Sequence, residues 1–593
     1  MHRAGFVRGI DLLALVTVSL LLLCTAQPIE PDTRLYRAAP KDVPLWAEQG
    51  NFRFIRLDGG QIESWKAERT WWGRKFSAEE KDVLSHTYDR DFEQMLNLLK
   101  EANFNWIWVT WSSGWSFKDE AENREKLKKV IARCHENGIH VSAYLSASNM
   151  FRDSAYRDDP ETKNYGLWMH GIPMFYAGPT MTDLHISWDR RLADTRYASW
   201  RAYLMRKAEL AVDAGVDAIV WDNMIGYKDG LAQLLDDTQH MAQRKARETG
   251  RPKVIVSANL HIPPDRFAMN DINEVVWEED GKDTPGVWSG LWQVDNARKI
   301  KFLNGEKQSW QPLMYENDLY HCGPRERCIP GPAEQKLSIA EAYAFGAATS
   351  RNIEGRFLAG LMKGDPNARE AWTAIAQYNH FLVEHRELYH QTIPVARIAL
   401  ISAEPHNLLA DTFIRQSVFF ETKVLNHLDK GTSLDRFKVV VLPDDLPGLT
   451  AGQRATLDKF VSGGGIILRA AKPEASIAQR AEGAAGGARV TLEPRRYVLG
   501  QLTRKADGHT VILHLLNYDL QAPAESVKVK LDLNGLICDA CVQDISRWEL
   551  KVFSPDAERP QIEGLSLRGT VAEFTLGRLD HYTVVTFSRR PTL

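Results

Sequence analysis

A regular alternation of short apolar runs and amphipathic stretches constrains the fold more than any other feature, and it extends from about residue 52 to residue 389. The apolar runs have the length of β-strands, and the stretches between them carry apolar residues at helical spacing. Strands that alternate with helices pair in parallel, and eight of them close most simply into a (β/α)8 TIM barrel. The sequence predicts this barrel within residues 27–390, with strands at 52–60, 104–111, 139–146, 217–223, 253–259, 273–280, 310–318 and 350–357.

The pattern changes after the barrel. Residues 391–480 contain a strand, a helix, a glycine turn and a second strand, as in "FKVVVLPDDLPGLTAGQRATLDKFVSGGGIILRAA", which predicts a small α/β domain. Residues 481–593 begin with an alanine- and glycine-rich linker and continue as short alternating runs separated by turns. These runs predict a C-terminal β-sandwich.

Residues 1–26 have the pattern of a signal peptide. Arg3 and Arg8 precede the apolar run "LLALVTVSLLLL", and the small residues Thr25 and Ala26 offer a cleavage site, so we expect export to the periplasm or the extracellular space. Lipoprotein anchoring at Cys24 is disfavoured, because such sites carry a small residue directly before the cysteine and Leu23 stands there. No later segment is predicted to be transmembrane.

Charge and cysteine content narrow the classes of ligand. The formal net charge of −3 gives no electrostatic reason to expect nucleic acid binding. Cys322 and Cys328 bracket a loop that a disulfide could close in an exported protein. Cys538 and Cys541 form a CxxC pair without a second pair or nearby histidines, which favours a local disulfide or free thiols over a metal site. We expect neither a metal nor a cofactor.

Polar and aromatic residues gather at the predicted carboxyl ends of the strands, where TIM barrels carry their chemistry. Any single one could be a helix cap or a turn residue. A ring of them is harder to explain structurally, because buried carboxylates repel one another and lose hydration. The candidate substrate-binding residues are Asp58, Trp111, Tyr144, Trp221, Asn223, Asn259, Trp277, Tyr315 and Glu354. For each aromatic a core position is the alternative, since strand residues alternate faces and the register is open.

Two carboxylates across such a pocket can cleave a glycosidic bond, one as nucleophile and the other as acid and base. Asp222 and Glu278 each end an apolar run beside a tryptophan, a setting that separates the proton affinities of two carboxyl groups. We therefore predict Asp222 as the nucleophile and Glu278 as the acid/base. Glu279 is an alternative because the register is uncertain by one residue, and Glu316 is another.

The domain order resembles that of β-galactosidases that carry a barrel, a trimerisation domain and a β-sandwich. That resemblance implies a flavodoxin-like domain over residues 391–480 and a homo-oligomer formed through it. The β-galactosidases use glutamates after strands four and seven, whereas strand four ends here in Asp222. Their geometry would make Glu316 a partner.

The strand-end motifs resemble families that retain configuration at α-glycosides. Asp222 with an acid after strand six is similar to dextranases and α-galactosidases, and "SANLH" and "VVWEED" are similar to the dextranase pattern. "IVWDN" and "CHENGIHVSAYLS" resemble α-L-fucosidases, although "VTWSSGW" stands where those carry His-His-Asp-Gly. The resemblance implies a retaining glycoside hydrolase acting on the O-glycosidic bonds of an oligo- or polysaccharide, and the leader over residues 1–26 implies that it is secreted. The alternatives are a non-catalytic carbohydrate-binding or scaffold protein and a barrel enzyme of other chemistry, such as a lyase.

Overall fold

The computed structural model describes residues 43–48, 50–57, 77–179, 184–259, 273–281, 287–288, 291–292, 294–307, 311–318, 329–352, 355–405, 407–430, 432–470, 475–494, 497–505, 510–536, 548–556 and 561–589. The predicted signal peptide and Cys322, Cys328, Cys538 and Cys541 lie outside these residues. Among the helices of the described part, none has the length and apolar character needed to cross a bilayer.

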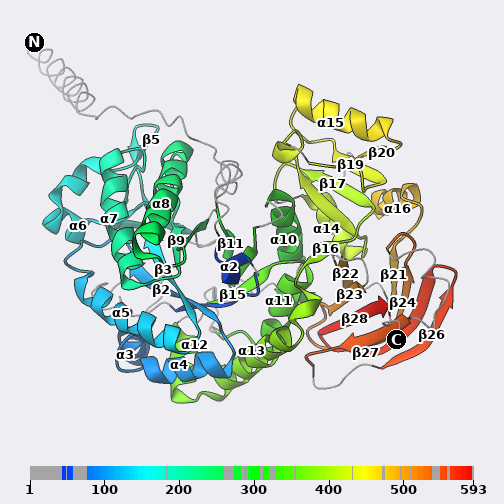
Figure 1. Ribbon diagram of the computed structural model, residues 1–593, viewed down its shortest axis with the longest axis horizontal. Coiled ribbons are helices and arrows are strands. Elements are labelled where there is room, and N and C mark those ends of the chain that lie inside the picture. The colour runs from blue at the N-terminus through cyan, green and yellow to red at the C-terminus, as the bar shows by residue number, and fades with distance from the viewer. Residues whose placement is uncertain are drawn as a thin grey trace, which may run out of the picture.

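Eight parallel strands close into a barrel, in the order β1-β2-β3-β9-β10-β11-β14-β15 and back to β1 (Figure 1). Each strand overlaps a run predicted from the sequence, so the barrel prediction is confirmed. The strands are β1 (Arg53–Leu57), β2 (Trp106–Ser112), β3 (His140–Ser146), β9 (Ala218–Asp222), β10 (Ile255–Asn259), β11 (Val276–Gly281), β14 (Leu313–Asp318) and β15 (Ala348–Asn352).

Amphipathic helices connect the strands and cover the barrel. In α4, for example, Phe92, Met95, Leu96, Leu98 and Leu99 are buried on one side, as helical spacing predicts. The helices of this part are α2 (Leu45–Glu48), α3 (Ala78–His86), α4 (Phe92–Glu101), α5 (Ala121–Glu136), α7 (Ala198–Ala214), α8 (Lys228–Thr249), α10 (Asp295–Glu306), α11 (Pro332–Ala344), α12 (Gly355–Lys363) and α13 (Pro366–Glu384), followed by the short η2 (Arg386–Leu388).

Large aromatic side chains fill the barrel interior. The rings of Phe54, Trp106 and Trp277 come from β1, β2 and β11, and their centroids lie 4.8–5.8 Å apart. All three are buried. Because side chains alternate along a strand, these contacts show which positions of each strand face inward.

A long insertion follows β3, at the carboxyl end of the barrel. It contains β4 (Asn149–Phe151), α6 (Arg152–Asp158), η1 (Pro160–Tyr165), β5 (Trp168–Met169), β6 (Ile172–Pro173), β7 (Phe175–Pro179) and β8 (Leu184–Leu192). β4, β8 and β7 form an antiparallel sheet, and β5 pairs with β6 as a hairpin. A second small hairpin, β12 (Val287–Trp288) with β13 (Leu291–Trp292), lies between β11 and α10.

The middle domain has a four-stranded parallel sheet in the order β18-β17-β19-β20. This is the 2-1-3-4 order of a flavodoxin-like sheet, as the fold prediction requires. Its elements are β17 (Ile398–Ser402), α14 (Leu408–Arg415), β18 (Phe420–Val424), η3 (Leu425–His427), β19 (Val439–Pro443), α15 (Ala451–Ser462), β20 (Ile466–Ala470) and α16 (Ala475–Ala484).

The C-terminal part is a β-sandwich of a five-stranded and a four-stranded sheet, as predicted. Buried residues of both sheets, such as Leu513 and Val529, share one apolar core. The first sheet has the order β16 (Thr392–Pro394), β22 (Val498–Lys505), β23 (Thr510–Asn517), β28 (Tyr582–Arg589) and β25 (Trp548–Phe553). The second has the order β21 (Val490–Glu493), β24 (Ala524–Asp532), β27 (Val571–Leu579) and β26 (Ile562–Arg568).

Barrel helix α10 links all three domains. Lys301 Nζ on α10 donates to the Phe420 carbonyl in β18 at 3.1 Å and to Gln501 Oε1 in β22 at 2.8 Å. One turn later Gly305 lies so close to β18 that an added Cβ would collide with the Thr422 carbonyl oxygen. The absence of a side chain at position 305 therefore allows the helix to reach the sheet.

We expect Gly305→Ala to lower the free energy of unfolding by about 1–3 kcal/mol, because the collision is with backbone that cannot move aside cheaply. Gly483→Ala in α16 is the matched control, since a Cβ there meets nothing within 4 Å. Alanine is the better helix former, so the control should be neutral or stabilising. Thermal and denaturant unfolding would measure both; equal effects would contradict the packing argument.

A buried polar chain joins the barrel to the sandwich. His514 Nδ1 in β23 lies 2.8 Å from the Tyr582 hydroxyl, which lies 2.9 Å from the Tyr389 hydroxyl just after η2. Burial lowers the pKa of His514 to about 3. The histidine is therefore neutral in the folded protein at neutral pH and its ring is sealed in the interface.

This shift predicts a loss of stability on acidification. Between about pH 6.5 and the folded pKa of about 3, the unfolded chain binds a proton at His514 that the folded chain does not. The free energy of unfolding therefore decreases as the pH is lowered through this window. His514→Gln removes the titrating group and should flatten the slope of unfolding free energy against pH in this window. An identical slope in both proteins would contradict the prediction.

Candidate active site

Asp222 ends β9 at the carboxyl end of the barrel and is 7% exposed. Its Oδ1 accepts a hydrogen bond from Asn259 Nδ2 and its Oδ2 accepts one from Asn223 Nδ2, each at 3.2 Å. Asn259 ends the neighbouring strand β10, and Asn223 adopts a left-handed backbone with φ of 51°, which asparagine tolerates well. Two amide donors from adjacent strand ends thus stabilise negative charge on Asp222.

An aromatic stack borders this carboxylate. Asn223 Nδ2 also approaches the Tyr144 hydroxyl at 2.7 Å. The Tyr144 ring stacks on Trp108 with centroids 4.6 Å apart, and the Arg56 guanidinium lies 4.6 Å from the centre of the Trp108 ring. Beneath them Trp277 lies 5.8 Å from Trp108. The site therefore combines an anionic group, amide donors and a cation with aromatic rings; Trp108 is as fully buried as Trp277, so Tyr144, 7% exposed, is the more accessible ring of the stack.

Three predicted stacking residues lie on the outer side of the barrel instead. Trp111 Nε1 donates to the Lys207 carbonyl of α7 at 3.0 Å, Trp221 Nε1 to Thr238 Oγ1 of α8 at 3.0 Å, and Tyr315 Oη to Asn296 Oδ1 of α10 at 3.2 Å. Each is at most 1% exposed. These positions are structural, because a strand residue that packs under a helix cannot also face the barrel mouth.

Of the other predicted binding residues, Tyr144, Asn223 and Asn259 are brought together around Asp222. Trp277 faces the interior but is fully buried, so it forms a floor and not an open stacking surface. Asp58 and Glu354 lie outside the described residues.

The backbone register of β11 and β14 orders the candidate acids. Glu278 pairs with Tyr315, and Glu279 pairs with Glu316. Position 277 faces the interior, and Tyr315 packs outward on α10. Trp277 and Tyr315 therefore lie on opposite sides of the sheet, while the side chains of Glu278, Glu279 and Glu316 are outside the described part of the structure.

Sequence reasoning did not select Arg56 and Trp108 as site residues. The signal was the two-residue alternation in "FNWIWVTW", which puts Trp106 and Trp108 on one face and Trp111 on the other. Which face turns inward is decided by contacts with Phe54 and Trp277 from distant strands.

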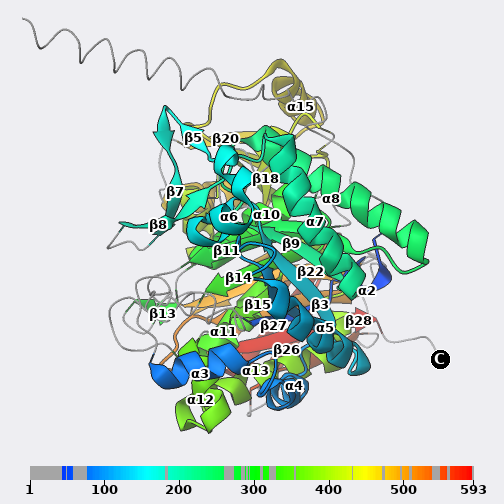
Figure 2. The same ribbon diagram turned by 90° about the vertical axis from the view of Figure 1, so that its left-hand side faces the viewer.

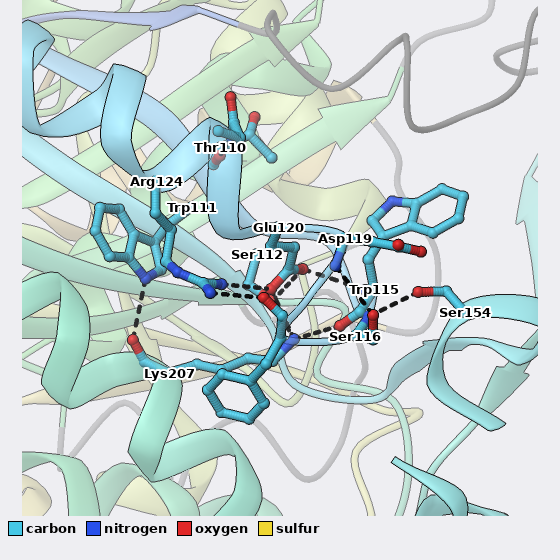
Figure 3. Close-up of polar contacts among 12 residues, drawn as sticks. Thr110, Trp111, Ser112, Trp115, Ser116, Asp119, Glu120, Arg124, Ser154 and Lys207 are labelled. Carbon is cyan, nitrogen blue, oxygen red and sulfur yellow. Dashed lines mark hydrogen bonds and ion pairs between the residues drawn. The ribbon is translucent and has the colours of Figure 1, made fainter. Parts of the chain in front are cut away.

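A buried ion pair holds the loop between β2 and α5 at the mouth (Figure 3). Lys207 Nζ of α7 donates to Glu120 Oε2 at 2.8 Å and to Ser112 Oγ at 3.1 Å, and it also contacts the Trp115 carbonyl. Glu120 Oε1 accepts from Ser112 Oγ at 2.8 Å and from the Trp115 amide at 3.2 Å. Burial lowers the pKa of Lys207, while Glu120 opposes that shift.

The loop is also fixed to the insertion after β3. Trp115 stacks on Phe151 of β4 with centroids 3.9 Å apart and planes at 6°. The Phe151 amide donates to the Gly114 carbonyl at 3.0 Å. The loops that follow β2 and β3 thus form one rigid rim beside Tyr144 and Asp222.

Among the described residues, no group of three or more His, Cys, Asp or Glu side chains is placed to hold a metal ion.

Comparison with known proteins finds similarity in structure but not in sequence. No protein-family model matches the sequence, and no curated protein matches it. The α-L-fucosidase isoenzyme 2 from Paenibacillus thiaminolyticus superposes with a TM-score of 0.61 at 12% identity, over 91% of this chain and 100% of that one. A cycloisomaltooligosaccharide glucanotransferase from Paenibacillus sp., solved with cycloisomaltoheptaose, gives a TM-score of 0.51 at 9% identity, over 91% of this chain and 85% of that one. The chain therefore has a glycosidase-like barrel fold.

We expect Lys207→Met to lower the free energy of unfolding by about 3 kcal/mol, because the buried Glu120 carboxylate then keeps only its longer ion pair with Arg124, at 3.6 Å. Lys128→Met is the control, since it breaks the ion pair between Lys128 and Glu125. Their side chains are 51% and 69% exposed, respectively. Solvent screens that pair, so its loss should be far smaller. Denaturant unfolding would measure both variants, and equal losses would show that the buried pair does not hold the rim.

Proposed function

We propose that this protein is a glycoside hydrolase that cleaves O-glycosidic bonds of an oligo- or polysaccharide by a retaining mechanism. The observation that carries the proposal is Asp222: a carboxylate at the carboxyl end of β9, held by the Asn223 and Asn259 amides beside an aromatic stack. The glycosidase-like fold supports it. Recognition of a sugar requires aromatic rings and polar groups in one pocket, and its cleavage requires carboxylates there.

In this proposal Asp222 is the nucleophile. Its two oxygens accept hydrogen bonds from two amides, which fix the orientation of the carboxylate and favour its ionised form. It attacks the anomeric carbon while the acid protonates the leaving oxygen. Water then cleaves the glycosyl-enzyme ester, with the former acid acting as base.

The register favours Glu279 as the acid/base over Glu278, the residue chosen from the sequence. Position 279 lies two residues beyond Trp277, which faces the barrel interior, and alternation along a strand favours the same side for it; its backbone pairs with Glu316 of β14. Glu316 is the second choice by the same argument. A carboxyl separation of about 5–5.5 Å from Asp222 would fit retention, and about 6.5–9.5 Å would fit inversion.

The rest of the proposal concerns the setting of the enzyme. We infer export from the leader pattern over residues 1–26, and oligomer formation through the flavodoxin-like domain from the resemblance in domain order. A non-catalytic carbohydrate-binding protein is the alternative, and the following experiment distinguishes it.

Hydrolysis of a panel of aryl α- and β-glycosides and polysaccharides should be detectable for the wild type. Asp222→Asn and Glu279→Gln should each lower kcat by about 10³-fold or more, because each removes a group that acts only in the transition state. Glu278→Gln should retain most activity. Loss of activity in Glu278→Gln but not in Glu279→Gln would reverse the assignment of the acid.

Asp217→Asn is the matched control for Asp222→Asn. Asp217 directly precedes the same strand at the opposite end of the barrel, where it lies 2.9 Å from His135 Nε2. Its loss should affect stability and leave kcat near the wild-type value. Hydrolysis that survives in Asp222→Asn would exclude Asp222 as nucleophile, and no hydrolysis by the wild type would favour the binding-protein alternative.

A further inference from the structure

A tryptophan outside the barrel is presented to solvent on a short hairpin. β5 and β6 pair Trp168 with Pro173, and the turn between them has positive φ at His170 and Gly171. Trp168 is 54% exposed, whereas most tryptophans of the barrel strands are fully buried. A single exposed hydrophobic side chain is ordinary in itself, so what points to a ligand is how this ring is supported and where the hairpin is attached.

The indole is mounted on a rigid support. The guanidinium carbon of Arg191, on β8, lies 5.3 Å from the Trp168 ring centre and 5.1 Å from that of Phe175. Arg191 is only 6% exposed, and its Nη1 donates to the Met174 carbonyl at 2.8 Å. Gly166 makes room for it, because an added Cβ would lie 2.8 Å from Arg191 Nε. One side of the ring is thus fixed by a buried cation.

The hairpin is tied to the loop that follows Asp222. The Tyr227 hydroxyl donates to the Trp168 carbonyl at 3.1 Å, and the Arg196 guanidinium covers the Tyr227 ring at 3.5 Å. Tyr227 lies five positions after Asp222, so their Cα atoms are at most about 18 Å apart. β5 lies with β7 and β8 at the upper left of Figure 2, in the insertion that follows the carboxyl end of β3.

We propose that Trp168 is a stacking platform for a sugar unit of the substrate beyond the one that is cleaved, which makes the protein select oligo- or polysaccharides over single glycosides. This inference rests on the proposed function. The C–H face of a pyranose presents apolar area and partial positive charge, which match the flat, electron-rich face of an indole. The surface area of one exposed ring is too small for a stable protein interface, which buries roughly 800 Å² on each partner.

The test compares substrates by length. With malto-, isomalto- and cello-oligosaccharides of increasing length and matching aryl glycosides, Trp168→Ala should lower kcat/KM for the long substrates about tenfold and leave the short aryl glycosides unchanged. Trp168→Phe should retain most of the activity, since it keeps an aromatic face. Ile172→Ala is the control: Ile172 is 62% exposed on the same hairpin but pairs with Met169, on the opposite face from Trp168.

Equal effects on short and long substrates, or no effect on either, would overturn the platform. If the wild type cleaves nothing on the panel, the proposed function fails while the platform is still testable by calorimetric titration of the same oligosaccharides. Binding that strengthens with length in the wild type and is lost in Trp168→Ala, but not in Ile172→Ala, would support the platform without hydrolysis. No binding by the wild type would overturn it.

Discussion

Closure of eight parallel strands into a barrel decides which side chains of those strands face the interior, and the candidate active site depends on it. Successive residues of a strand point to opposite sides, and closure makes one side the interior and the other the helix-covered exterior. Trp106 and Trp277 meet in the interior, and this contact fixes which neighbours share it. Trp108, two positions beyond Trp106, lies on the same inner side and nearer the mouth. Trp111 lies on the other side of the strand and packs under α7.

The interior changes character along the barrel axis. Aromatic rings fill its middle, where they remove apolar surface from water, and polar groups gather at its carboxyl end. Asp222 lies at this boundary and is stabilised by amides from its own and the next strand end. Around it the rim is made rigid from outside by the buried Lys207–Glu120 pair. A site that must hold its groups in fixed positions gains from such support.

The two C-terminal domains are built onto the barrel and not merely tethered to it. Lys301 reaches both from α10, Gly305 allows close approach to β18, and the His514–Tyr582–Tyr389 chain is sealed between barrel and sandwich. These interfaces are buried and polar, so each requires specific partners. The chain is therefore joined across its domains by contacts between residues far apart in sequence.

The amino-acid sequence by itself determined the strand count, the three-domain order and the place of Asp222 at the end of the fourth strand, because periodicity and turn residues are local signals. It left the inner face of each strand open, since an alternation with a period of two fits either side. Contacts across the closed barrel decided this: they moved Trp111, Trp221 and Tyr315 to the outside and brought Arg56 onto Trp108. Only the tertiary structure could do so, because the groups that fix each face come from strands and helices remote in the chain.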